Sequence, residues 1–237
     1  RAIAELAGFY NVHGFKMMVL KGYACSINWP KPEHRPCGDI DIWLFGKQND
    51  ADVALAKEKD VEIDSSHHHH TVFYWGDFMV ENHYDFVNVH GRKSSVEIED
   101  VFKELGMDDS NVVEVNGEKV FLPSSNLHAL VLVKHMVSHF ASANISLRQV
   151  LDWAFYVKAH SETIDWNWLD TVLDEYHMRE FYNCINAICV VELGFEAYLF
   201  HGVQFNPVVK EKVLEDVLEP KFTMEEPQRF ISRLSYK

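Results

Sequence analysis

The stretch RPCGDIDIWLF, residues 35–45, decides the fold and raises the first question about function. Apart from Asp39 and Asp41, residues 39–45 have the apolar character of a buried strand. Side chains alternate between the two faces of a strand, so both aspartates point the same way, with Cα atoms about 6.5–7 Å apart. Carboxylates this close repel each other unless a cation or a proton lies between them. The pair is either a metal-binding pair or a hydrated strand end, and this stretch alone favours neither.

Composition limits the classes of function. The chain has 237 residues and a formal charge of −14, with histidine counted as neutral. This length suits one large domain or two small ones around a real hydrophobic core. The negative charge argues against a protein that holds a nucleic-acid backbone mainly by a basic surface. It does not exclude a small anionic substrate that is carried in with a divalent metal ion.

Two further features bear on where the protein works. The four cysteines form no CxxC pair, and we recognise no secretory segment, so we expect reduced thiols in a cytoplasmic protein. No apolar run reaches membrane-spanning length, so we expect no membrane partner.

The internal run HHHH at 67–70 is either a metal-binding tract or a solvated loop before a strand. We favour the solvated loop.

The pattern of apolar residues, caps and turn signals divides the chain into two halves. The first half alternates predicted helices with strands and hairpins, and after Pro123 the chain reads as nearly all helix. The fold class is therefore α+β, with a small mixed β-sheet domain at 1–122 followed by an all-helical domain at 123–237. The predicted helices of the first half are 2–15, 48–59 and 95–105, its strands are 16–20, 39–45, 71–75, 78–86, 112–115 and 118–122, and the later helices are 124–141, 146–160, 165–177 and 179–194.

The predicted strand FMVENHYDF, residues 78–86, supplies a third acid. Alternation puts Glu81, His83 and Asp85 on one face and a mostly apolar set on the other, which we expect to cover the core. A position beside residues 39–45 would bring Glu81 next to the two aspartates. Three carboxylates from two strands form an oxygen-rich site that suits Mg²⁺ or Mn²⁺. The face that we expect to cover the core carries Phe78, Val80, Asn82, Tyr84 and Phe86.

Repulsion between the aspartates has a consequence for stability. Neutralising either one keeps its shape and removes one of two like charges. We therefore expect Asp39→Asn and Asp41→Asn to leave the metal-free protein as stable as the parent, or more stable.

Four segments, in order along the chain, resemble a known family. They are VLKGYA, RPCGDIDIWL, VENHYDF and HMVSHFASANISLRQVLDWAF. In this order they resemble the polymerase-beta-like nucleotidyltransferase superfamily, and more closely the bacterial family of uncharacterised nucleotidyltransferases. The resemblance covers most of the chain, and GDID is its most specific motif. One departure is that the superfamily usually carries a Gly-Ser pair where this chain has Lys21 and Gly22.

The resemblance implies roles for individual residues. Asp39, Asp41 and Glu81 would be catalytic and would hold Mg²⁺ or Mn²⁺, with Glu81 placed to hold a second ion or to draw a proton from the attacking hydroxyl. Two ions about 3.5–4 Å apart can stabilise the attacking and leaving oxygens of an in-line displacement. The residues implied in nucleotide binding are Lys21, Gly22, Arg35, Gly38 and Arg148, with His83 and Asp152 as supporting partners.

For several of these residues, a purely structural role stays open as the alternative. Lys21 is equally well a solvated lysine at a strand end, and Arg35 could offset the repulsion between the aspartates. Arg148 and Asp152 stand at i and i+4, the spacing of a local helical ion pair worth only a few tenths of a kcal/mol.

The expected function is a metal-dependent nucleotidyltransferase. It would move a nucleoside monophosphate from a nucleoside triphosphate (NTP) to an acceptor hydroxyl and release pyrophosphate. The expected partners are NTP and a small acceptor, with a large nucleic acid disfavoured by the net charge. The alternatives are a catalytically weak or inactive nucleotide-binding module of the same fold, and a metal-dependent phosphohydrolase built on the same acids.

Overall fold

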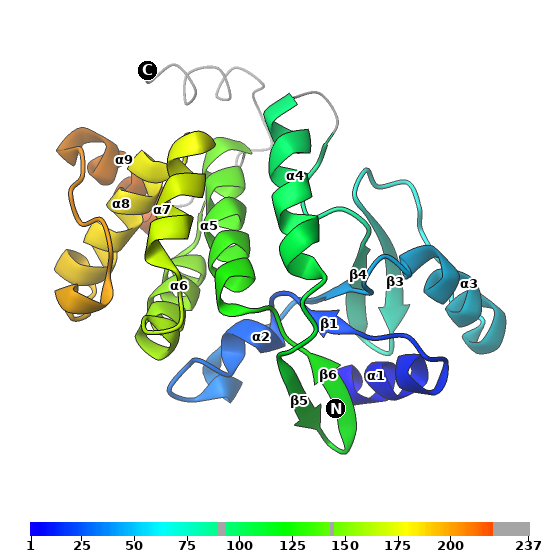
Figure 1. The fold of residues 1–237 in the computed structure, drawn as a ribbon. Coiled ribbons are helices and arrows are strands. Elements are labelled where there is room, and N and C mark those ends of the chain that lie inside the picture. Colours follow the sequence, from blue (N-terminus) through cyan, green and yellow to red (C-terminus); the bar gives the residue numbers. More distant parts are fainter. Residues whose placement is uncertain (90–92, 143–144, 220–237) are drawn as a thin grey trace. The chain divides into compact units, whose positions relative to one another are not determined.

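The computed structural model describes residues 1–89, 93–142 and 145–219 (Figure 1). The chain divides into two compact units, Arg1–His128 and Ala129–Lys237. The predicted division into 1–122 and 123–237 places the boundary a few residues earlier. The end of the predicted helical domain, from residue 220 onward, lies outside the described residues.

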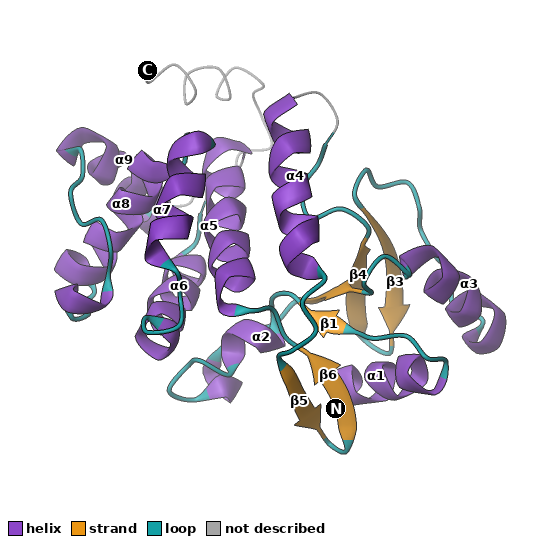
Figure 2. Cartoon of the chain, viewed as in Figure 1, coloured by secondary structure: helices purple, strands orange, loops and turns teal. Residues whose placement is uncertain are grey.

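The first unit is built on a six-stranded mixed sheet with the strand order β3-β4-β2-β1-β6-β5 (Figure 2). Strand β2 runs parallel to β4 and β1 runs parallel to β6, while the other neighbours are antiparallel. The predicted small mixed sheet is therefore confirmed. The strands are β1 (Met18–Val19), β2 (Asp39–Trp43), β3 (His70–Trp75), β4 (Phe78–His83), β5 (Val112–Val115) and β6 (Glu118–Phe121).

Helices complete the first unit and dominate the second. The first unit holds α1 (Ala2–Val12), α2 (Tyr23–Ser26), the 3-10 turn η1 (Pro32–His34), α3 (Gln48–Lys59) and α4 (Lys93–Gly106). From α5 (Ser125–Ser142) onward the chain forms α6 (Leu147–His160), α7 (Trp166–Glu175), α8 (Arg179–Ala187), the π-helical turn η2 (Ile188–Glu192), the 3-10 turn η3 (Ala197–Leu199) and α9 (Pro207–Leu218). Within the described residues, none of these helices combines the length and the apolar character needed to cross a bilayer.

The two faces of the sheet have different coverings. Side chains of Ile40, Ile42 and Val80 are buried with residues of α1 and α3 in one hydrophobic core. The next residues along the strands therefore point to the opposite face. On that face the indole nitrogen of Trp43 donates a hydrogen bond to the carbonyl of Gly106 at the end of α4, with 3.1 Å between the two atoms. In Figure 1, α1 and α3 lie on one side of the strands and α4 on the other.

Strand β4 ends earlier than the sequence predicts. It stops at His83, and the amides of Tyr84 and Asp85 both donate to the carbonyl of His69 at 3.1 Å. The predicted core role of Phe86 is therefore wrong, and that of Phe78, the first residue of β4 after the turn, is wrong as well. Phe78 is 41% exposed, and Phe86 stacks on Phe102 of α4 with 5.3 Å between the ring centroids.

Asp85, which was predicted to share one strand face with Glu81 and His83, lies beyond the end of β4. The chain has already left the strand at Tyr84, so alternation no longer applies to Asp85. Its carboxylate pairs instead with the ammonium of Lys103 on α4.

A buried polar network fixes which face of β4 carries Glu81 and His83. The amide of Asn82, which is fully buried, donates to Asp52 of α3 at 2.8 Å, and the hydroxyl of Thr71 donates to the other oxygen of that carboxylate at 2.7 Å. With Asn82 held against α3, its neighbours on β4 must face the other way, because a slip of one residue would exchange the faces.

Asn82→Ala should therefore destabilise the protein by about 2–4 kcal/mol, since it leaves a buried carboxylate with one partner fewer and opens a small cavity. The matched control Asn49→Ala changes an exposed asparagine on α3 and should stay within about 0.5 kcal/mol of the parent. Urea denaturation of the three proteins measures both values. Equal stability of the two variants would show that the network does not hold β4 in place.

Candidate active site

The site begins with the parallel pairing of β2 and β4. In this register Asp41 lies opposite Glu81 and Trp43 lies opposite His83. One ligand atom each from Asp41, Glu81 and His83 lie within 4.8 Å of one another. Asp39 stands two residues before Asp41 on the same face of β2. We call Asp39, Asp41 and Glu81 the acid cluster.

The cation that the two aspartates require is present within the chain. The ammonium of Lys21 lies 2.7 Å from Oδ1 of Asp41, and these side chains are 19% and 1% exposed. The pairing of β1 with β2 brings them together, since the amide of Leu20 donates to the carbonyl of Asp41 at 2.9 Å. Lys21 is therefore neither a solvated strand-end lysine nor a remote charge, because it is the direct partner of a buried carboxylate.

His83 connects the acids of the two strands. Its Nε2 lies 3.2 Å from Oδ1 of Asp41 and 3.5 Å from a carboxylate oxygen of Glu81. Its Nδ1 lies 3.3 Å from the carbonyl oxygen of Asp85. Burial by itself would lower the pKa of His83, but the hydrogen bonds to Asp41 and Glu81 outweigh it and raise the pKa. The imidazolium form is thus favoured between the two carboxylates.

The three carboxyl groups of the acid cluster differ in pKa. Burial would raise the pKa of Asp41, but Lys21 and His83 outweigh it and hold that pKa below its ordinary value. The hydrogen bond from His83 lowers the pKa of Glu81 against the opposing effect of burial. Burial, followed by repulsion from Asp41, raises the pKa of Asp39. Asp41 is the firmly ionised member of the pair, and Asp39 is the member that takes up a proton more readily.

Gly22 lies against the backbone of the acid strand. Its φ is +58°, and a Cβ atom there would come within 3.3 Å of both the carbonyl oxygen of Asp39 and the Sγ of Cys37. A side chain would therefore be strained by the backbone and crowded by its neighbours. Glycine at this position lets the turn after Lys21 approach β2 closely.

The loop before β2 holds the other predicted phosphate contacts. The guanidinium of Arg35, a residue only 9% exposed, donates from Nη1 to the carbonyl of Pro36 at 3.1 Å and also lies 3.7 Å from the Sγ of Cys37. Gly38 is exposed and directly precedes Asp39. The nucleotide-binding roles of Arg35 and Gly38 stay predictions.

Arg148 and Asp152 lie on α6 in the second unit, whereas the acid cluster lies wholly in the first. Asp152 is buried and Arg148 is partly exposed. Their predicted roles toward the nucleotide stay predictions.

The sequence interpretation missed two histidines. The predicted solvated loop at 67–70 is wrong for its last residue, because His70 opens β3, is 7% exposed and lies opposite His83. His69 is half-buried, and only His67 and His68 are exposed. A signal was available, because the two-residue turn at 76–77 fixes the register of the hairpin, and counting outward from it pairs residue 70 with residue 83.

The environment of these histidines favours the uncharged form. Burial, followed by repulsion from His70 and His83, lowers the pKa of His69 to about 4. Burial also lowers the pKa of His70, although the nearby carboxylate of Glu81 opposes it. Both imidazoles are therefore neutral near pH 7, with nitrogen lone pairs available.

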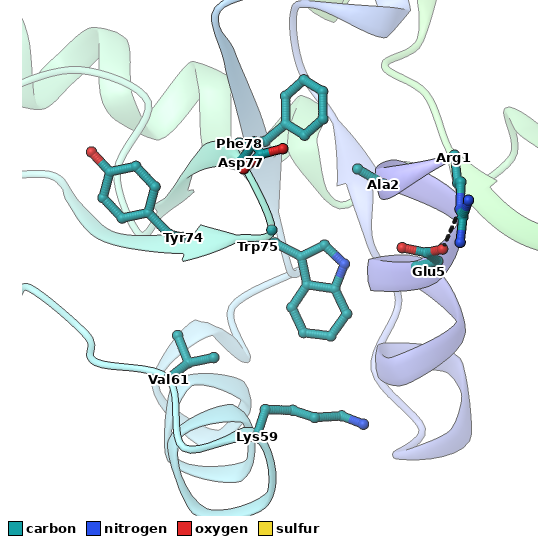
Figure 3. Close-up of a pocket in the computed structure, with 10 residues that line it drawn as sticks. Arg1, Ala2, Glu5, Lys59, Val61, Tyr74, Trp75, Asp77 and Phe78 are labelled. Carbon is teal, nitrogen blue, oxygen red and sulfur yellow. Dashed lines mark hydrogen bonds and ion pairs between the residues drawn. The ribbon is translucent and has the colours of Figure 1, made fainter.

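A separate pocket of about 570 Å³ lies at the turn of the β3–β4 hairpin (Figure 3). Figure 3 shows the indole of Trp75 facing it, with Lys59 on one side and the Arg1–Glu5 ion pair on the other. His83 lies at the opposite end of β4 from this turn. The pocket is lined by none of the acid cluster and is not the site of the predicted chemistry.

The sheet, with its acids on adjacent strands, belongs to the nucleotidyltransferase fold. The solution structure of the antibiotic-resistance factor ANT(2'')-Ia is similar to this chain, with a TM-score of 0.50 and 8% identity over 75% of this chain and 90% of that one. A crystal structure of ANT(2'')-Ia in complex with adenylyl-2''-tobramycin has a TM-score of 0.49 and 9% identity, over 75% of this chain and 95% of that one. The crystal structure of an antigenic nucleotidyltransferase-like protein from Paracoccidioides brasiliensis has a TM-score of 0.47 and 15% identity, over 73% of this chain and 84% of that one.

The chain belongs to the family of uncharacterised nucleotidyltransferases, whose model matches residues 1–193. The family predicted from the four segments is thereby confirmed. No curated protein is similar enough to the chain to count as a relative.

The unequal charges of the aspartates revise the expectation for their neutral variants. Asp41→Asn should destabilise the metal-free protein by on the order of 3 kcal/mol, because it leaves the largely buried ammonium of Lys21 without its negatively charged partner. Asp39→Asn should be neutral or stabilising by up to about 1 kcal/mol, because it relieves repulsion at a carboxylate whose pKa is raised.

Thermal unfolding at pH 7 with EDTA compares these two variants with the parent. The stability that Asp41 contributes is present above the unfolded pKa of an aspartate, about 3.9, and is lost as the pH falls through the lower folded pKa. The difference between the parent and Asp41→Asn should therefore shrink at acid pH. Equal melting temperatures for the two variants at pH 7 would contradict the assigned ion pair.

Proposed function

We propose that this protein is a divalent-metal-dependent nucleotidyltransferase that moves a nucleoside monophosphate from NTP to the hydroxyl of a small acceptor. The observation that carries the proposal is the position of Asp41 beside Glu81 and His83 on one face of two parallel strands, with one ligand atom of each within 4.8 Å of the others. Membership of the nucleotidyltransferase family supports the reaction class.

The donor set fits a hard divalent cation. Carboxylate oxygens are the ligands that Mg²⁺ and Mn²⁺ prefer, and phosphate oxygens of the substrate complete their shells. The residues that would hold metal are Asp39, Asp41 and Glu81. The structure already attracts a cation here, since the ammonium of Lys21 lies 2.7 Å from Asp41. When bound, the metal would supply positive charge to the phosphates and to the developing charge of the transition state.

The proposed reaction balances without an oxidant or a further reactant. The acceptor hydroxyl oxygen forms a bond to the α-phosphorus of NTP, and the bond from that phosphorus to the bridging oxygen of the β-phosphate breaks. Pyrophosphate leaves with the electron pair of the broken bond. Glu81, whose lowered pKa keeps it ionised, would accept the hydroxyl proton in this proposal.

The other residues have binding and positioning roles in this proposal. Lys21, Gly22, Arg35 and Gly38 would bind the phosphates of NTP near the acids, and the nucleotide-binding role of Arg148 on α6 stays a prediction. His83 holds Asp41 and Glu81 through one imidazole nitrogen. Asp152 would support Arg148, which precedes it by one helical turn.

A cytoplasmic location completes the proposal. The described cysteines form no disulfide, and Cys25, Cys184 and Cys189 are buried. Reduced thiols suit a compartment rich in thiol reductants, where NTP is also available.

One observation favours a second candidate, a nucleotide-binding module with little or no turnover. Lys21 and His83 both contact Oδ1 of Asp41, so an incoming metal ion would compete with two existing partners. NTP binding with no transfer to any acceptor, and with no hydrolysis, would support this candidate. Hydrolysis without an acceptor would instead identify a phosphohydrolase.

Substitution of the acids tests the catalytic role. An α-labelled NTP is incubated with Mg²⁺ or Mn²⁺ and a panel of small hydroxyl acceptors, and labelled products are followed. Asp39→Asn, Asp41→Asn and Glu81→Gln should each lower turnover by about 10²-fold or more, because the charges they remove act on the transition state. His83→Ala should cost less, about 10–100-fold, as a partner that orients the carboxylates.

The matched control for this experiment is Asp50→Asn, which neutralises an exposed aspartate on α3 and should retain full turnover. Asp39→Asn is the most informative variant, because its predicted stability separates loss of chemistry from loss of fold. Full activity in Asp39→Asn and Asp41→Asn would exclude the proposed role of the acid cluster.

Binding measurements test the link between metal and nucleotide. Calorimetry should show weak binding of Mg²⁺ alone and tighter binding in the presence of NTP, because phosphate oxygens complete the coordination shell. The same coupling should be reduced in Glu81→Gln and retained in Asp50→Asn. NTP binding of equal strength with and without metal would contradict the proposed site.

A further inference from the structure

A group of three imidazoles lies beside the acid cluster, and two of them, His69 and His70, have no part in the proposed reaction. One ring nitrogen each from His69, His70 and His83 lie within 4.8 Å of one another. The ring centroids are 4.4 Å apart for His69 and His70, 5.2 Å for His70 and His83, and 5.7 Å for His69 and His83. We call these three residues the histidine cluster.

The backbone holds the histidine cluster in place. His70 is the antiparallel partner of His83 at the end of the β3–β4 hairpin. The carbonyl of His69 accepts two hydrogen bonds at 3.1 Å from the amides of Tyr84 and Asp85, which immediately follow His83. The three side chains are therefore carried by segments that are fixed to each other, and they do not belong to a free tail.

Two nitrogens of the histidine cluster lack the partners that buried polar atoms normally have. Nδ1 of His69 and Nδ1 of His70 are buried and accept or donate no hydrogen bond. His70 as a whole is only 7% exposed. Leaving such a group unsatisfied costs about 1–3 kcal/mol, so the rings of His69 and His70 keep a donor or acceptor capacity that the described residues do not use.

The donor chemistry selects the class of ligand. Imidazole nitrogen suits Zn²⁺ and similar transition metals and is a poor ligand for Mg²⁺. A negative charge is close by, since a carboxylate oxygen of Glu81 lies 3.9 Å from Nε2 of His70 and another lies 3.5 Å from Nε2 of His83. Three imidazoles and one nearby carboxylate form a donor set of the kind that holds a single four-coordinate metal ion.

We propose that His69, His70 and His83 form a binding site for one borderline transition-metal ion of the Zn²⁺ class, separate in chemistry from the oxygen site of the acid cluster. The two sites share the side chain of His83, which would release its proton on binding the ion, because only a neutral imidazole ligates a metal. The proposal does not rest on nucleotidyl transfer, because it concerns metal binding by the resting protein.

Calorimetric titration of the metal-free full chain with ZnCl₂ tests the proposal, and the visible absorption of added Co²⁺ reports four-coordinate nitrogen ligation. We expect one Zn²⁺ per chain. His69→Ala and His70→Ala should each weaken binding by at least about 10–100-fold, the loss that removal of a supporting partner alone produces at metal sites. His69 is half-buried, so His69→Ala is the variant that least perturbs the fold.

His68→Ala is the matched control, because it removes an exposed imidazole from the same run of four and lies outside the cluster. It should bind Zn²⁺ like the parent, and so should Asp39→Asn. Excess Mg²⁺ should not displace the ion.

Three results would overturn the proposal. The first is the absence of saturable Zn²⁺ binding. The second is an equal loss in His68→Ala and His69→Ala, which would show that the run binds metal as a flexible tract. The third is loss of Zn²⁺ in Asp39→Asn or its displacement by Mg²⁺, which would place the ion on the acids. Failure of nucleotidyl transfer would leave all these measurements unaffected, so the two proposals can fail separately.

Discussion

The parallel pairing of β2 with β4 is the contact on which the rest of the site depends. It sets Asp41 opposite Glu81, and it does so because Ile40, Ile42 and Val80 are buried on the other face against α1 and α3. Burying each such side chain contributes about 1.5–3 kcal/mol. Two carboxylates 4 Å apart repel by about 1–4 kcal/mol between water and a protein surface. The apolar face is therefore strong enough to hold the acids together.

The positive charges on the polar face compensate the acids unequally, and this difference sets which acid stays ionised. Lys21 and His83 both contact the same oxygen of Asp41, whereas Asp39 carries a raised pKa. The acid cluster is thus not a set of equal, mutually repelling acids. It contains one strongly held carboxylate at its centre, with Glu81 ionised beside it and Asp39 as the member whose protonation is least costly.

The polar face of β4 continues from oxygen donors into nitrogen donors. Glu81 contacts His83, His83 lies opposite His70, and His69 is fixed by the chain that follows His83. Strand β4 therefore contributes side chains to both the acid cluster and the histidine cluster, whose donor atoms prefer different metal ions. His83 belongs to the histidine cluster and contacts Asp41 and Glu81, so a change to this side chain affects both groups.

The sequence by itself determined the parts of the molecule that depend on local geometry. Helix α3 begins and ends at residues 48 and 59 as predicted, and the two hairpins form around their predicted turns. The shared face of Asp39 and Asp41 also follows from the sequence, because side chains alternate along any strand. The third acid, on β4, was found in the same way, since alternation places Glu81 on the opposite face of the strand from the core-facing Val80.

Only the tertiary structure decided how these parts meet. The pairing of β1 with β2 brought Lys21 to Asp41, and the hydrogen bonds from Tyr84 and Asp85 to His69 ended β4 early. Alternation along one strand is set by covalent geometry and can be read from a few residues. The neighbour of a strand, and the partner of a buried charge, depend on packing between segments far apart in the chain, and local patterns carry no record of that choice.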